Sequence, residues 1–124
     1  LTFARAGHNP LIVHKSVSGA PLLLNPKGLA IGMDPGAVFA KTIEEVSVPF
    51  APGDLFVFYT DGISECMNKN GEEFGEERLS GFIGQNAHVP AQALLERIKQ
   101  EITQYSAGAH QHDDYTMVVV KVKS

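Results

Sequence analysis

The densest cluster of apolar residues along the chain lies at 55–59 and predicts a buried strand. Leu55–Tyr59 consists of aliphatic and aromatic side chains and follows a Pro-Gly-Asp turn at residues 52–54. Runs of this kind, bounded by turn signals, are typical of buried strands. The run ends at Thr60-Asp61-Gly62. An acidic side chain is therefore expected at the end of the strand, at the rim of the core, where water and ligands can reach it.

A second apolar run, at residues 115–122, follows an acidic pair. Asp113 and Asp114 come directly before this run of mostly β-branched residues. If the two strands are antiparallel neighbours, the end of the first lies beside the start of the second. The pattern then predicts that Asp61 and Asp113 meet at one edge of the sheet. Clustered carboxylates repel one another unless a cation neutralises them, and all-oxygen sites suit Mg²⁺ or Mn²⁺.

Two later stretches have the period of amphipathic helices. One begins at Glu76-Glu77, where negative charge suits the helix dipole. The other is predicted over Pro90–Ser106, because proline fits a first helical turn and apolar residues follow at helical spacing. The residues expected to face the sheet from this second helix are Leu94, Leu95, Ile98 and Ile102.

The first half of the chain predicts strands and turns. Residues 1–6 and 11–15 are expected to form a hairpin around the turn at 7–10. Residues 25–35 predict an ordered loop that Leu29, Ile31 and Met33 pin to the core. Val38–Phe50 alternates between apolar and polar residues and predicts one long strand or two short ones. The predicted fold class is α+β, an antiparallel sheet with two main helices on one side.

Four blocks of sequence, in order, carry a resemblance to a known family. The blocks are ARAGHNPLIV, TDG followed by ISE, NGEEFGEERL, and DDYT before the last apolar run. They resemble the bacterial SpoIIE/RsbU-type branch of the metal-dependent serine/threonine protein phosphatase (PPM) family, over residues 3–122. The resemblance implies the second half of that family's αββα sandwich.

One block of the family has no counterpart here. The family's first half carries a D-x-x-G-type motif whose aspartate bridges two metal ions, and no such block precedes Asp54. The nearest, Asp34-Pro35-Gly36, falls in a predicted loop. Residues 1–124 are therefore expected to be the C-terminal part of a single PPM-type domain whose N-terminal half is absent. A chain that begins at Leu1, without methionine, favours this interpretation.

The resemblance implies roles for four residues. Asp61 and Asp113 correspond to catalytic ligands of a binuclear Mn²⁺ or Mg²⁺ site, which in the family holds the water that attacks phosphorus. Gly62 corresponds to a point of close backbone approach. Asp114, where many relatives have asparagine, corresponds to a position beside the ligands.

The implied activity is the removal of phosphate from serine or threonine of a protein. In this branch the usual substrate is a STAS-type anti-sigma-factor antagonist, and the resemblance implies a sensor or receiver domain upstream in the parent chain. The isolated fragment is expected to be inactive, and its unpaired strand edges favour a homodimer.

Several alternatives stay open at the level of the residues. The whole chain could be a non-catalytic module that keeps the fold for binding. Asp61 could simply cap the short helix after it. His110-x-His112-Asp113 could belong to a zinc site, although zinc needs three or four ligands and the other histidines are scattered. Cys66 could be a nucleophile, although the sequence places no base in partnership with it.

Charge and composition exclude some functions. The net charge of −4 leaves no basic footprint for nucleic acid or an anionic membrane. No apolar run approaches the roughly 20 residues of a membrane span. A single cysteine excludes an internal disulfide and suits a reducing compartment, so a cytoplasmic location is expected.

Overall fold

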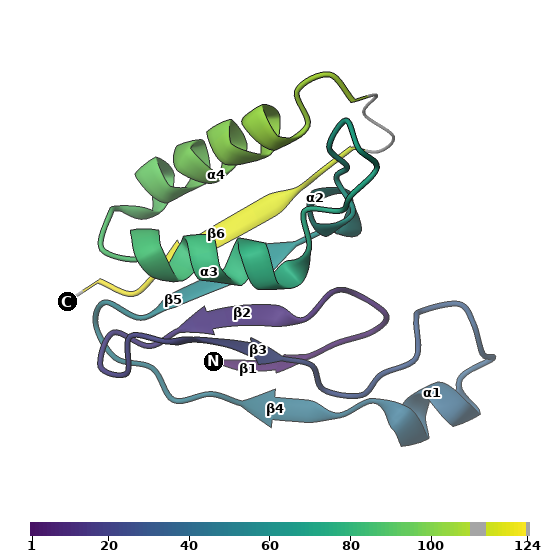
Figure 1. The fold of residues 1–124 in the computed structure, drawn as a ribbon. Coiled ribbons are helices and arrows are strands. Elements are labelled where there is room, and N and C mark those ends of the chain that lie inside the picture. Colours follow the sequence, from purple (N-terminus) through teal and green to yellow (C-terminus); the bar gives the residue numbers. More distant parts are fainter. Residues whose placement is uncertain (110–113, 124) are drawn as a thin grey trace.

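A four-stranded antiparallel sheet in the order β3-β2-β5-β6 forms the centre of the fold (Figure 1). The computed structural model describes residues 1–109 and 114–123. A separate two-stranded ribbon pairs β1 with β4. The strands are β1 (Thr2–Ala4), β2 (Leu11–His14), β3 (Pro21–Leu24), β4 (Glu45–Ser47), β5 (Leu55–Tyr59) and β6 (Met117–Lys121). The helices are α1 (Ala37–Thr42), α2 (Asp61–Ser64), α3 (Glu76–Asn86) and α4 (Ala91–Tyr105).

Strand β5 lies between β2 and β6, as its continuous apolar sequence predicts. It runs antiparallel to β6, with Tyr59 at its end opposite Met117 at the start of β6. The prediction that the end of one strand lies beside the start of the other is therefore confirmed for the described residues. The carboxyl end of β5 and the residues just before β6 share one edge of the sheet.

Helices α3 and α4 lie on the same face of this sheet (Figure 1). Their apolar residues form the main core with Ile12, Leu55 and Val57 of the sheet, all fully buried. On α4 the buried residues follow the predicted spacing, while Leu95 is only half-buried at the margin. The α+β class is confirmed. The buried helical residues are Leu79 and Ile83 of α3, and Leu94, Ile98 and Ile102 of α4.

The opposite face of the sheet, called the outer face below, is only partly covered. Leu11, Val13 and Phe56 form a second core cluster there, against which Phe3 of β1 and Val46 of β4 pack. Beyond the reach of this ribbon, three large apolar side chains of β5 and β6 remain exposed. They are Phe58 (38% exposed), Val118 (51%) and Val120 (45%).

The predicted opening hairpin is wrong, because β1 pairs with β4 and not with β2. Every residue of β2 is buried. A strand that is buried throughout needs neighbours on both sides, and β2 has them in β3 and β5. No edge of β2 is left for β1, so the turn at 7–10 carries the chain from one sheet to the other.

The predicted strand over Val38–Phe50 is also wrong in its first half, where the chain forms α1. The Asp34 carboxylate accepts hydrogen bonds from the backbone N–H groups of Gly36, Val38 and Phe39, at 2.7, 2.9 and 3.2 Å. These bonds, that from Gly36 above all, lower the pKa of Asp34. Local hydrogen bonding of this kind starts a helix in spite of the alternating pattern.

The loop at 25–35 is not pinned to the core as predicted. Ile31 and Met33 are 81% and 72% exposed, and Leu29 is half-buried.

Candidate metal-binding site

The chain changes from strand to helix at Thr60. Thr60 has extended backbone angles (φ −95°, ψ 160°), and its carbonyl oxygen accepts a hydrogen bond from the N–H of Ile63 at 3.1 Å. Helix α2 therefore begins at Asp61, which is exposed. The Asp61 carboxylate accepts a hydrogen bond from the N–H of Gly62 at 3.0 Å. Asp61 is thus the first residue of the helix, while the capping position belongs to Thr60.

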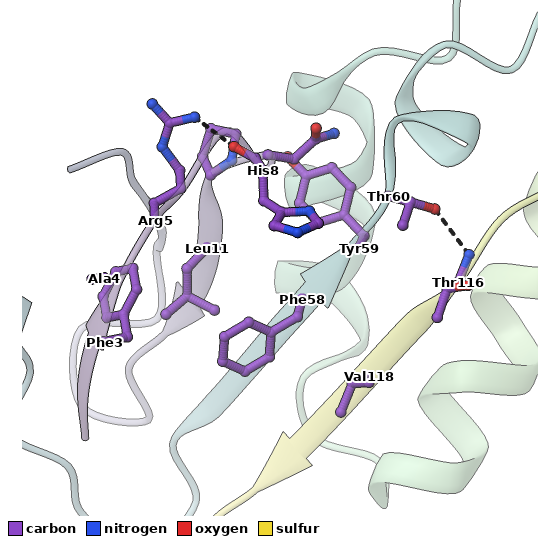
Figure 2. A pocket seen from close by; sticks show the side chains of 12 residues that line it. Phe3, Ala4, Arg5, His8, Leu11, Phe58, Tyr59, Thr60, Thr116 and Val118 are labelled. Carbon is purple, nitrogen blue, oxygen red and sulfur yellow. Dashed lines mark hydrogen bonds between the residues drawn. The ribbon is translucent and has the colours of Figure 1, made fainter. Parts of the chain in front are cut away.

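Two hydrogen bonds join Thr60 to Thr116, just before β6, and Figure 2 shows the one that involves the Thr60 hydroxyl. The N–H of Thr60 donates to the Thr116 carbonyl oxygen at 3.1 Å. In return, the N–H of Thr116 donates to the Thr60 hydroxyl oxygen at 2.9 Å. The end of β5 and the approach to β6 are therefore held together one residue before Asp61.

Gly62 brings the two segments into backbone contact. A Cβ atom at this position would lie 2.5 Å from the carbonyl oxygen of Asp114, closer than real Cβ atoms approach. Only glycine fits without moving the segments apart. Asp61 and Asp114, both exposed, consequently lie on adjoining backbone segments at one edge of the sheet.

Asp113, His110 and His112 lie outside the described residues. The pairing of Asp61 with Asp113 and the zinc alternative therefore stay predictions. Within residues 1–109 and 114–123, no group of three or more His, Cys, Asp or Glu side chains is placed to hold a metal ion. Asp61 and Asp114 are oxygen donors of the kind that Mg²⁺ and Mn²⁺ bind. They fit such an ion in kind, but supply only part of a shell of about six oxygens.

The turn that connects β1 to β2 supports helix α2. The side-chain amide of Asn9 donates to the hydroxyl of Ser64 at 3.2 Å, and that hydroxyl donates to the backbone carbonyl of Asp61 at 3.3 Å. The Arg5 guanidinium donates to the backbone carbonyls of Pro26 and His8 and fixes the turn from its other side. Sequence reasoning missed Asn9 and Ser64, and their places in the blocks ARAGHNPLIV and ISE were the only signal.

A cavity of about 300 Å³ lies beside this edge, between the β1–β2 turn and the outer face of β5 and β6 (Figure 2). Phe3, Leu11, Phe58 and Val118 are among the apolar residues that line it. Thr60 and Thr116 line the end nearest Asp61, and His8 lies at the side of the turn. The cavity is therefore apolar along most of its length and polar where it meets the candidate site.

The loop after α2 is held by aromatic residues. Phe74 is buried (3% exposed) and meets the Tyr105 ring edge-on, with centroids 5.1 Å apart. The Tyr105 hydroxyl donates to the backbone carbonyls of Glu72 and Glu73 at 3.0 Å each. Phe74 thus anchors this acidic loop, and the loop has a fixed place beside the site.

Two further side chains complete the surroundings. Tyr59 donates its hydroxyl to Glu76 at 3.0 Å, and burial, together with this acidic partner, raises the pKa of Tyr59. Cys66 is a free thiol that is half-buried against the main core and does not line the cavity. Its environment is that of a packing residue.

The comparison with protein-family models decides the family. The model described as Stage II sporulation protein E (SpoIIE) matches residues 1–123. The chain belongs to the SpoIIE family. It is thereby a member of the wider PPM/PP2C phosphatase-domain family.

Individual relatives agree with this assignment. The chain is 33% identical over 120 residues to Protein IcfG of Synechocystis sp. (strain ATCC 27184 / PCC 6803 / Kazusa), covering 97% of this chain and 18% of IcfG. It is 27% identical over 123 residues to Phosphoserine phosphatase RsbU of Bacillus subtilis (strain 168), covering 98% of this chain and 35% of RsbU. Among solved structures, the SiaA-PP2C domain of Pseudomonas aeruginosa has the same fold, with a TM-score of 0.79 and 24% identity over 98% of this chain and 46% of that chain.

The chain thus spans less than half the length of each of these three proteins. Among the helices of the described residues, none has the length and apolar character needed to cross a bilayer.

Proposed function

We propose that this SpoIIE-family chain is the C-terminal part of a metal-dependent protein serine/threonine phosphatase domain. The observation that carries the proposal is the strand end at Thr60-Asp61-Gly62. There, an exposed carboxylate is held beside the segment that starts at Asp114. An exposed carboxylate at the rim of the core adds little to the stability of the fold. It can, however, bind a cation.

The proposed metal is Mn²⁺ or Mg²⁺, with Asp61 and Asp113 as ligands and Asp114 beside them. When bound as a pair, such ions lower the pKa of a water molecule and neutralise phosphate charge. The chain's own residues fix the backbone on which Asp61 and Asp114 stand. Thr60 fixes the backbone before Asp61, and Gly62 lets the Asp114 backbone approach it.

The remaining ligands are proposed to come from the other half of the domain. Two features support this division. The chain covers 46% of the SiaA-PP2C domain, and its outer face exposes Phe58, Val118 and Val120. A further cavity of about 220 Å³ on this face is lined by Leu1, Phe50, Phe56, Phe58, Val120 and Val122. Packing the second sheet of a sandwich on this face would bury these side chains.

The proposed substrate is a phosphoprotein, and a STAS-type anti-sigma-factor antagonist is the specific candidate. The support is the similarity to RsbU, which is named a phosphoserine phosphatase, over 98% of this chain. With that substrate we propose a sensor or receiver domain upstream and a cytoplasmic location. Association of two copies through unpaired strand edges is the expected behaviour of the isolated chain.

A non-catalytic binding module is the second candidate. The observation in its favour is that no metal-binding cluster of three side chains exists among the described residues. The sequence that precedes residue 1 in the parent discriminates the two candidates. A D-x-x-G-type motif after a strand favours catalysis, and its loss favours binding alone.

The decisive experiment is hydrolysis of a phosphoserine peptide by the full-length protein. We expect turnover with Mn²⁺ and none with EDTA. The purified 124-residue chain should be inactive over a concentration series, because too few carboxylates remain to complete the ion's shell. Turnover by this chain alone, independent of its concentration, would contradict the division of the site. An inactive full-length protein that retains the D-x-x-G motif would favour the binding module.

A further inference from the structure

Thr60 both pairs with Thr116 in the sheet and begins helix α2. The backbone of a regular strand residue cannot do both. In an antiparallel ladder, Thr60 and Thr116 would exchange two backbone hydrogen bonds. One is present, from the N–H of Thr60 to the carbonyl of Thr116 at 3.1 Å. The carbonyl of Thr60 has left the ladder, because it accepts the N–H of Ile63 to begin α2.

The hydroxyl group of Thr60 replaces the missing carbonyl. It accepts a hydrogen bond from the N–H of Thr116 at 2.9 Å (Figure 2). The last hydrogen-bonded pair of the ladder is therefore kept while the backbone turns into the helix. An N–H group left without an acceptor would separate the strands or draw water between them. The next residue of the chain is Asp61, and Asp114 lies two residues before Thr116.

We infer that the Thr60 hydroxyl is a positioning group that sets the place of Asp61 relative to the segment beginning at Asp114. The inference rests on the proposed function, since it takes Asp61 to be a metal ligand whose position matters for binding the ion. The two backbones are already in close contact at Gly62, because the Asp114 carbonyl oxygen lies only 2.5 Å from the point where a Cβ atom would be. A shift at Thr60 is therefore transmitted directly to the Asp61 backbone.

A threonine in a strand could instead serve only to stabilise the fold. The two roles differ in what they change. A purely stabilising residue changes the free energy of unfolding and leaves the metal affinity of the folded protein unchanged. A positioning residue changes the metal affinity of the folded protein, and serine, which keeps the hydroxyl, restores it.

The test uses the full-length protein with Thr60→Val, which keeps the size of the side chain and removes the acceptor, and Thr60→Ser. Thr103→Val is the matched control, because the Thr103 hydroxyl is on the exposed face of α4 and its hydrogen bond, donated to the Lys99 carbonyl, stays within that helix. Mn²⁺ affinity is measured by calorimetry, and exchange of the Thr116 amide by NMR or mass spectrometry. Partners that orient metal ligands typically contribute about 10- to 100-fold in affinity.

We expect Thr60→Val to weaken Mn²⁺ binding within this range and to speed exchange at Thr116, while Thr60→Ser and Thr103→Val remain close to wild type. If wild-type protein binds Mn²⁺ and folded Thr60→Val binds it equally well, the inference is wrong and the proposed function stands. If wild-type protein binds no Mn²⁺, the proposed function fails and the inference with it. Should valine prevent folding, Thr60→Ala provides the same comparison. If alanine also prevents folding, the hydroxyl is a general requirement of the fold and the positioning role is overturned.

Discussion

Two aspartates flank strand β5, and their surroundings are opposite. Asp54, just before the strand, is buried, with an exposed fraction of 2%. Its carboxylate accepts hydrogen bonds from the Lys15 ammonium (2.8 Å), the N–H and hydroxyl of Ser16 (2.9 and 3.1 Å) and the N–H of Ala51 (3.0 Å). Asp61, just after the strand, is exposed and accepts the N–H of its neighbour Gly62.

The difference separates a carboxylate that holds the fold from one that is available to a ligand. Burial alone would raise the pKa of Asp54, but the hydrogen bonds from Lys15, Ser16 and Ala51 outweigh it and hold this pKa well below its usual range. The protein itself satisfies the charge of Asp54. Within residues 1–109 and 114–123, the charge of Asp61 meets no cationic side chain and is open to solvent or to a cation, although both residues occupy similar places in the sequence pattern.

The largest expected effect is on stability, at Asp54. In Asp54→Asn, the amide nitrogen would face either Lys15 and Ala51 or the two donors of Ser16, and both donors on that side would lose their acceptor. Breaking a buried ion pair in this way costs about 3–5 kcal/mol, and the lower end, about 3 kcal/mol, is expected here because the Lys15 side chain is 24% exposed. Equilibrium denaturation of the full-length protein measures the change. A loss below about 0.5 kcal/mol, as at a surface position, would show that Asp54 is not structural.

The next effect is on activity, at Asp61. Asp61→Asn keeps the size of the side chain and removes the charge that would bind the ion. Phosphatase activity of the full-length protein should fall by about 100- to 1,000-fold, the range seen when a principal electrostatic group is lost. Its unfolding free energy should change by less than about 0.5 kcal/mol, because the side chain is exposed. Near-normal turnover at saturating Mn²⁺ would exclude Asp61 as a principal ligand.

The elements around these residues could largely be predicted from sequence, because their signals are local and periodic. The run at 55–59 and the apolar spacing of Leu94, Ile98 and Ile102 indicated β5 and α4 correctly. Strand-end placement was enough to bring Asp61 next to the start of β6. The pairing of β1 with β4 was missed, since no periodicity in the sequence indicates which distant strands pair.

Side-chain hydrogen bonds between distant residues were missed for the same reason. Thr60 and Thr116 are 56 positions apart, and Asn9 and Ser64 are 55 apart. Nothing in their spacing indicates a contact. The sequence also could not show that Asp54 is structural and Asp61 is available to a ligand. The burial of Asp54 depends on Lys15 and Ser16, which belong to the connection between β2 and β3.

A smaller effect is expected from acid. In the unfolded chain Asp54 should titrate near its ordinary pKa of about 3.9, and in the folded protein its pKa is lower. The stabilisation is therefore fully present above the unfolded pKa and is lost as the pH falls through the folded one. The unfolding free energy of wild-type protein should fall more steeply with acid below about pH 4 than that of Asp54→Asn. Parallel acid profiles for the two proteins would contradict the assignment.

The smallest effect is expected at Cys66. Cys66→Ala removes a half-buried thiol that packs against the core, so turnover should stay within about twofold of wild type and stability should change modestly. Phosphatase assays after a check of folding measure this. A folded but inactive Cys66→Ala protein would replace the carboxylate account with a thiol nucleophile.

A Mn²⁺ titration of the full-length protein shows whether Asp61 binds a divalent metal ion. Asp61→Asn is compared with wild type and with Glu45→Gln, which removes the same charge from an exposed residue of β4. We expect Glu45→Gln to bind Mn²⁺ as wild type does. Asp61→Asn should bind at least about tenfold more weakly, since a carboxylate ligand contributes more than the groups that orient it. Equal Mn²⁺ affinity of all three proteins would contradict metal binding by Asp61.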